Sequence, residues 1–136
     1  MNTFTPTQGT LPLLVSVPHA GTHIPTDLRK AFTDKALEVE DTDWHLEKLY
    51  AFATELGASL IVPTYSRYVI DLNRPPDNQP MYPDANNTEL CPTRAFTSLP
   101  IYRGTPPDES EIERRIRGGE TFATAAVAVG CSTKSI

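Results

Sequence analysis

The 136-residue sequence has few of the features that mark disulfide-stabilised, secreted or membrane proteins. Its two cysteines, Cys91 and Cys131, are far apart and form no Cys-x-x-Cys motif, so we expect two reduced thiols. No apolar run is long enough to span a membrane, and residues 1–8 lack the basic and apolar regions of a secretory signal. The sequence therefore predicts a cytoplasmic protein without a membrane partner.

Motifs for nucleotide binding and serine-hydrolase chemistry are also missing. The sequence has no glycine-rich phosphate-binding loop and no sharp glycine-flanked turn around a nucleophilic serine. Its 12 lysine and arginine residues are outnumbered by 17 aspartate and glutamate residues, for a net charge of -5. We expect no nucleic-acid partner, because phosphate binding requires a basic surface. A small anionic ligand is compatible with this charge, since it needs only one or two arginines.

The residues that are present indicate a single α/β domain. Hydrophobic residues make up 39% of the chain, which is typical of a globular protein. Residues 11–17 and 58–62 are predicted to be buried strands, the first of them a central parallel strand covered by helices. Between them, apolar positions at helical spacing predict a helix over residues 43–56 that ends at Gly57. This unit implies a parallel sheet, to which residues 67–72 would add a third strand.

The rest of the chain is predicted to be rich in turns and loops. Residues 26–32 and 35–39 have the pattern of short helical turns, and residues 108–117 that of a second good helix. The proline-rich segment 78–107 has little periodicity, and a loop of that length is usually functional or mobile. Residues 118–136 differ in composition from the preceding chain. Their two charged residues are Glu120 and Lys134.

Two histidines follow the first predicted strand. His19 and His23 lie at the carboxyl end of residues 11–17, where open α/β sheets bind their ligands. The prolines and the glycine around them favour a loop over a helix, and a loop can present one or both imidazoles to a metal ion. The alternative is that each histidine only hydrogen-bonds a turn.

Acidic residues gather at the start of the predicted helix, where Asp41 and Asp43 precede His45. Carboxylates are ordinary caps at a helix N-terminus, and either Asp41 or Thr42 is a suitable cap here. Two acids beside a histidine also fit a metal site. A catalytic zinc site takes about three protein ligands and leaves one position for water. His19 and Asp43 would supply two of them, and the third must come from elsewhere.

Arginines bracket the predicted third strand. Arg67 precedes it, and Asn73 and Arg74 follow its end. A guanidinium group can hold a carboxylate through two parallel hydrogen bonds, so these residues are candidates for binding an acidic substrate. The alternative is that both arginines pair with Asp71 or Asp77 on the surface.

Three blocks of sequence carry a resemblance to a known family. Residues 16–25 (SVPHAGTHIP), 41–45 (DTDWH) and 66–76 (SRYVIDLNRPP) resemble N-formylglutamate amidohydrolase, also called N-formylglutamate deformylase. The resemblance covers roughly residues 10–117. It implies a three-layer α/β/α sandwich of the zinc-exopeptidase (phosphorylase/hydrolase-like) type. It also implies hydrolysis of N-formyl-L-glutamate to formate and L-glutamate, a step of histidine degradation.

The same resemblance assigns roles to residues. It implies that Zn²⁺ is the cofactor, that His19 and Asp43 are metal ligands, and that Arg67, Asn73 and Arg74 bind substrate. His23 would be a supporting or substrate-facing group.

The family also takes a later histidine as ligand and a late glutamate as general base. This sequence has no histidine after His45, so its catalytic base stays unassigned and is expected in a missing C-terminal part. We therefore expect residues 1–117 to be the N-terminal part of the family domain. Residues 118–136 would be an atypical tail, either frame-shifted or disordered.

Three hypotheses follow from the sequence. The chain is part of a formylglutamate hydrolase, an inert fragment with the same partial fold, or a non-enzymatic module that binds an acidic amino acid. The inert fragment would neither bind zinc tightly nor turn over substrate, and the binding module would use Arg67 and Arg74 without a metal ion.

Overall fold

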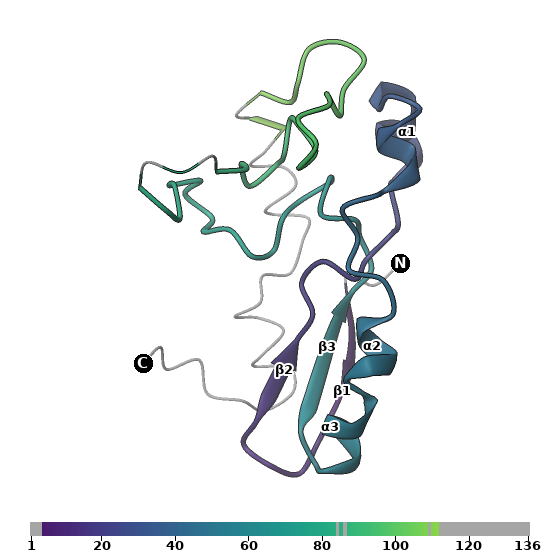
Figure 1. The fold of residues 1–136 in the computed structure, drawn as a ribbon, viewed down its shortest axis with the longest axis vertical. Helices are drawn as coiled ribbons and strands as arrows, with labels where there is room; N and C mark the ends of the chain where they lie inside the picture. Colours follow the sequence, from purple (N-terminus) through teal and green to yellow (C-terminus); the bar gives the residue numbers. More distant parts are fainter. Residues whose placement is uncertain (1–3, 84, 86, 109, 112–136) are drawn as a thin grey trace.

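A small mixed sheet and a loop-rich region form the two ends of the molecule in the computed structural model (Figure 1). The structure describes residues 4–83, 85, 87–108 and 110–111. Their secondary structure, in chain order, is β1 (Phe4–Thr7), β2 (Leu14–Ser16), α1 (Thr26–Ala31), the 3-10 helix η1 (Ala36–Glu38), α2 (Leu46–Leu49), α3 (Ala51–Glu55) and β3 (Ser59–Pro63).

The sheet confirms the predicted parallel pair but changes its order. β2 runs parallel to β3, with Val15 opposite Leu60, while β1 pairs with the other edge of β3 in antiparallel register. The prediction that residues 11–17 form the central strand is wrong, because β3 lies between β1 and β2. Leu11 instead enters a turn in which its amide donates to the carbonyl of Gly57. β1 was not predicted, since three of its four residues are exposed and one is a proline.

The predicted helix over residues 43–56 is two shorter helices, α2 and α3. His45 has a left-handed backbone with φ of 64°, so the helix begins only at Leu46, and no side chain caps it. Asp41 and Thr42 therefore do not have the predicted capping role. Gly57 ends α3 at φ of 94°, as its sequence position predicts.

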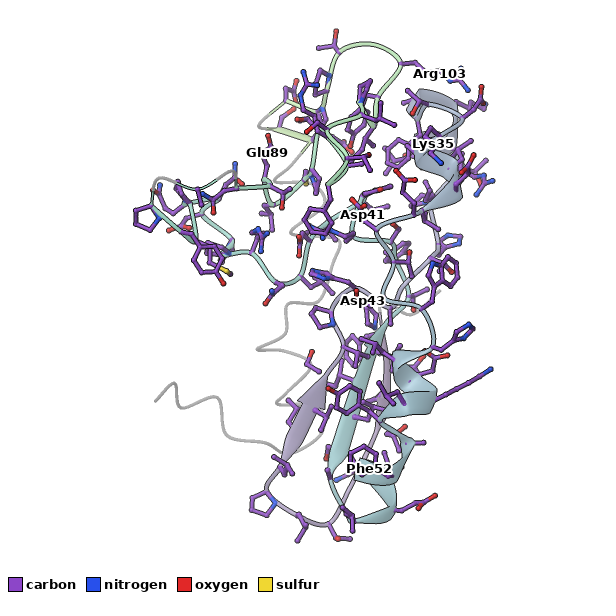
Figure 2. All side chains as sticks on the ribbon, in the orientation of Figure 1. Lys35, Asp41, Asp43, Phe52, Glu89 and Arg103 are labelled. Atoms are coloured by element: carbon purple, nitrogen blue, oxygen red, sulfur yellow. The ribbon has the colours of Figure 1, made fainter. Side chains whose placement is uncertain are left out.

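The apolar face expected of that helix is also mostly exposed. Leu49 and Leu56 are 64% and 70% exposed, and Phe52, labelled at α3 in Figure 2, is 54% exposed. Ala53 is the buried residue of α3, and its small side chain lets the helix lie close to β3. Helical spacing thus identified a helical segment without identifying which of its faces is covered.

The predicted third strand over residues 67–72 is wrong. The segment is a turn, in which the amide of Val69 donates to the carbonyl of Ser66 and the amide of Tyr68 donates to the Ser66 hydroxyl. Tyr68 and Val69 are buried in a hydrophobic cluster outside the sheet, which explains an apolar pattern without a strand.

That cluster forms the core of the loop-rich end. It is built around α1 and η1, which confirm the two predicted helical turns, although Pro25 rather than Thr26 or Asp27 is the first cap residue. Phe32 is fully buried and packs edge-to-face on Tyr102 at 5.0 Å between ring centroids. The remaining buried members are Ile24, Leu28, Ala36, Val39, Tyr68, Val69, Ala95 and Ile101.

The end of the described chain agrees with its predicted start of a helix. The Asp108 carboxylate accepts hydrogen bonds from the amide of Glu111 and the hydroxyl of Ser110. The rest of the predicted helix to residue 117, and the predicted tail 118–136, lie outside the described residues. Cys91 is buried, whereas Cys131 lies outside the described residues. No helix within the described ranges has the length and apolar character to cross a bilayer.

Candidate metal and carboxylate site

The candidate site lies where the chain leaves the carboxyl ends of β2 and β3. After β2, the amide of Val17 still donates to the carbonyl of Ile61, and the chain then turns at residues 18–20. This turn holds His19, whose carbonyl accepts from the amide of Asp43 at 3.0 Å. In Figure 2, Asp43 lies just beyond the ends of the parallel strands. Backbone pairing therefore joins the first two of the three sequence blocks.

Asp71 links these blocks to the third. Its Oδ1 lies 2.8 Å from Nε2 of His19, and its Oδ2 accepts a hydrogen bond from Nη2 of Arg67 at 2.6 Å. The amide of Asn73 donates to the same Oδ1 at 2.9 Å. Asp71 is fully buried, and both of its carboxylate oxygens have partners. His19 and the amide of Asn73 contact Oδ1, and Arg67 contacts Oδ2.

Electrostatics keep the Asp71 carboxylate charged despite its burial. Burial alone would raise the pKa of Asp71, but the hydrogen bond with His19 and the charge of Arg67 lower that pKa below its ordinary value. A charged acceptor at Nε2 favours the tautomer with the proton on Nε2. The lone pair of His19 Nδ1 is then free to bind a metal ion.

The Nδ1 atom faces a second carboxylate. It lies 3.6 Å from Oδ2 of Asp43, whose side chain is about half exposed. Two ligands of one tetrahedral zinc ion, at bond lengths of 2.0–2.2 Å, lie about 3.4 Å apart. The residues present therefore fit two zinc ligands, an imidazole backed by a buried carboxylate and an acid open to solvent. The described residues contain no group of three or more metal-ligating side chains, so the donor set is partial.

His23 lies in the same loop but is held differently. Its backbone pairs with residues 64–66, and its ring contacts Tyr65 at 5.3 Å between centroids. Gly21 permits this approach, because a Cβ atom there would lie 2.1 Å from the carbonyl oxygen of Tyr65. The glycine between the two histidines is thus required for packing.

Arg67 is buried rather than on the surface. Its guanidinium lies 4.0 Å from the centroid of the Phe96 ring, and its Nη2 contacts Asp71 and Thr88. The Nε and Nη1 atoms are buried without a hydrogen-bond partner among the described residues. The pairing with Asp71 that sequence offered as an alternative does exist, but inside the protein and through one nitrogen only.

Arg74 has no acidic partner within the described part of the chain. Its Nε donates to the carbonyl of Thr88 at 3.0 Å, its Nη2 to the Thr88 hydroxyl at 2.9 Å, and its Nη1 to the carbonyl of Asn73. The Asn73 side chain is exposed. The Asp41 carboxylate accepts a hydrogen bond from the amide of Phe96, the residue whose ring lies against Arg67.

Two residues of this arrangement were not predicted as site residues, Asp71 and Thr88. Asp71 entered the sequence analysis only as a surface partner for arginine. Its sequence signal was a carboxylate in an otherwise apolar stretch, four positions after an arginine. Thr88 has no sequence signal, because only the fold of the long loop brings it to the arginines.

The fold and site together define an α/β protein with a histidine–carboxylate pair at the ends of parallel strands, where open α/β sheets bind their ligands. The model of one family, N-formylglutamate amidohydrolase, matches residues 11–118. The chain belongs to this family.

Individual relatives agree with this assignment. The chain is 45% identical over 108 residues to a protein of Pseudomonas putida and 46% identical over 105 residues to one of Pseudomonas aeruginosa, both named N-formylglutamate deformylase. A crystal structure of N-formylglutamate amidohydrolase from Ralstonia eutropha JMP134 superposes with a TM-score of 0.72 at 26% identity. That superposition covers 96% of this chain and 50% of the crystal structure's chain. The matches to the two Pseudomonas proteins cover 79% and 76% of this chain, but only 40% and 39% of those relatives.

Proposed function

We propose that this chain carries the N-terminal part of an N-formylglutamate deformylase, which hydrolyses N-formyl-L-glutamate to formate and L-glutamate. The observation that carries the proposal is the orientation of His19, whose Nε2 contacts buried Asp71 while its Nδ1 faces Asp43. A histidine held in this way by a carboxylate is typical of metal ligands. The names of the Pseudomonas relatives support the substrate.

His19 and Asp43 would hold Zn²⁺. When bound, zinc supplies a Lewis acid that polarises an amide carbonyl and acidifies a water molecule. Asp71 keeps the proton of His19 on Nε2, and Arg67 neutralises the buried Asp71 carboxylate from its other oxygen. These two residues therefore act on the metal site through His19.

Arg67, Asn73 and Arg74 would bind the carboxylates of the substrate, with His23 facing it. Arg67 supports this assignment, because its Nε and Nη1 have no acceptor among the described residues. Arg74 supports it because the oxygens that accept its hydrogen bonds there are neutral carbonyl and hydroxyl groups. Fixing the substrate by its carboxylates would place the formyl amide in a defined orientation, which lowers the entropic part of the barrier.

The general base and the third metal ligand are proposed to lie in a part of the family domain beyond the matched span. This part would also complete the three-layer α/β/α sandwich of the zinc-exopeptidase type, of which the described residues form a mixed sheet with helices beside it. The process served would be cytoplasmic histidine degradation. Because the described residues supply two of about three metal ligands, we expect the chain as given to have weak or no activity.

Purified chain should be tested for bound zinc and for formate release from N-formyl-L-glutamate, beside the full-length Pseudomonas putida relative. We expect detectable but weak zinc binding and formate release far below that of the relative. One equivalent of tightly bound zinc with normal turnover would show that the chain is a complete enzyme. Tight binding of L-glutamate without zinc would instead favour a metal-free binding module.

A further inference from the structure

Thr88 lies between the two arginines of the proposed substrate site. Its hydroxyl accepts a hydrogen bond from Nη2 of Arg67 at 3.1 Å and another from Nη2 of Arg74 at 2.9 Å. Arg67 and Arg74 are separated by a turn, while Thr88 comes from the long loop next to Glu89, which Figure 2 labels. One uncharged oxygen from a distant segment therefore joins two guanidinium groups.

This arrangement has more positive than negative charge. Asp71 is the acidic partner of Arg67, and it is shared with His19. The carboxylate of Glu89 does not balance the arginines, because it accepts from the amide and hydroxyl of Thr93. Two guanidinium groups with one shared carboxylate leave a positive charge that one further anion would balance.

Hydrogen-bond donors without an acceptor also favour an anion at this position. Arg67 is 2% exposed, yet its Nε and Nη1 have no acceptor among the described residues. A threonine hydroxyl has two lone pairs and one proton, and both lone pairs of Thr88 are directed to arginines. Its proton has no acceptor within the described ranges. The unfilled donors of Arg67 and the Thr88 proton belong to two side chains in contact, and a carboxylate is an acceptor-only group that can satisfy them.

We infer that Thr88 is a specificity-determining residue, whose hydroxyl holds Arg67 and Arg74 together as a clamp for one carboxylate of the substrate. The inference rests on the proposed function, because it assigns a carboxylate substrate to these arginines. Thr88 spaces the two guanidinium groups and donates its own proton to the bound carboxylate. Phe96, stacked on Arg67, keeps water from one face of the clamp.

The contacts of Thr88 allow its hydroxyl to be tested separately from its backbone. The Thr88 carbonyl accepts from Nε of Arg74, and this contact ties the loop to the site whatever side chain is present. Thr88→Val keeps the shape and the backbone contact but removes the hydroxyl, whereas Thr88→Ser keeps the hydroxyl. Thr97→Val is the matched control, since the Thr97 hydroxyl contacts Glu40 in a neighbouring loop and no arginine.

The experiment titrates the purified chain with N-formyl-L-glutamate and follows the arginine Nε–H resonances by NMR. We expect saturable shifts in the unaltered chain, in Thr88→Ser and in Thr97→Val, and about tenfold weaker binding in Thr88→Val. The diamide of N-formyl-L-glutamate, which has no carboxylate, should cause no shift. Backbone amide spectra report whether each variant is folded.

The outcomes separate this inference from the proposed function. If Arg74→Met abolishes binding and Thr88→Val binds like the unaltered chain, the role of Thr88 is overturned while the substrate assignment stands. If the unaltered chain binds the diamide as well as the dicarboxylate, the carboxylate clamp is overturned. If N-formyl-L-glutamate causes no shift in any arginine resonance, the assignment of these arginines to the substrate is overturned with it.

Discussion

The Nε2 atom of His19 lies 2.8 Å from Oδ1 of Asp71, although 52 positions separate the two residues. The contact joins the loop after β2 to the turn after β3, and it sets which nitrogen of His19 faces Asp43. The metal-binding chemistry proposed for the chain depends on this pair.

Replacing Asp71 by asparagine should weaken zinc binding by about 10- to 100-fold, because a neutral amide fixes the tautomer of His19 less strongly. It should also destabilise the fold by about 3 kcal/mol, since buried Arg67 loses its countercharge. Zinc affinity is measured by competition with a chromophoric chelator, and stability by urea denaturation. Asp77→Asn, at an exposed carboxylate, is the control. Unchanged zinc affinity in a folded Asp71→Asn chain would refute the orienting role.

His19→Ala should abolish the weak zinc binding of the chain, and Asp43→Ala should reduce it strongly, because each removes one of two proposed ligands. The same chelator competition measures both. His45→Asn is the matched control, since His45 is exposed and asparagine tolerates its left-handed backbone. Zinc retained unchanged by His19→Ala would contradict the ligand assignment.

Gly21→Ala should destabilise the chain by about 1–3 kcal/mol, the usual cost of overpacking a buried position. Its Cβ would lie 2.1 Å from the carbonyl oxygen of Tyr65, and a backbone atom cannot move aside as a flexible side chain can. Gly104→Ala is the control, because nothing lies within 4 Å of its added Cβ. Thermal unfolding compares the two, and equal melting temperatures would show that the loop of His19 and His23 relaxes freely.

Phe32→Ala should cost about 3–5 kcal/mol of unfolding free energy, because Phe32 is fully buried at the centre of the hydrophobic cluster. Phe52→Ala, at a phenylalanine that is 54% exposed on α3, should change it by less than about 0.5 kcal/mol. Urea denaturation of both variants measures the difference. A comparable loss in Phe52→Ala would mean that another molecule covers the outer side of α3.

Several elements of the fold were predictable from local sequence. The parallel pairing of β2 and β3, the helical turns at α1 and η1, and the end of α3 at Gly57 each have a signal within a few residues.

The errors have a common cause. The apolar stretch 67–72 was predicted to be a strand because burial and strand formation leave similar patterns, but Ser66 caps a turn there. Leu49 and Leu56 were expected in the core by spacing, which does not tell which helix face is covered.

The sequence by itself determined the family and the residue types of the site. His19, Asp43, Arg67 and Arg74 lie in three short blocks whose amino-acid sequence and order are specific to the family. Only the tertiary structure decided how these residues act on one another. The sequence suggested Asp71 as a surface partner of arginine. In the structure, its buried carboxylate contacts both His19 and Arg67. Thr88 was one of many loop residues. The physical reason is that hydrogen bonds between residues far apart in the chain depend on backbone placement, which no local pattern encodes.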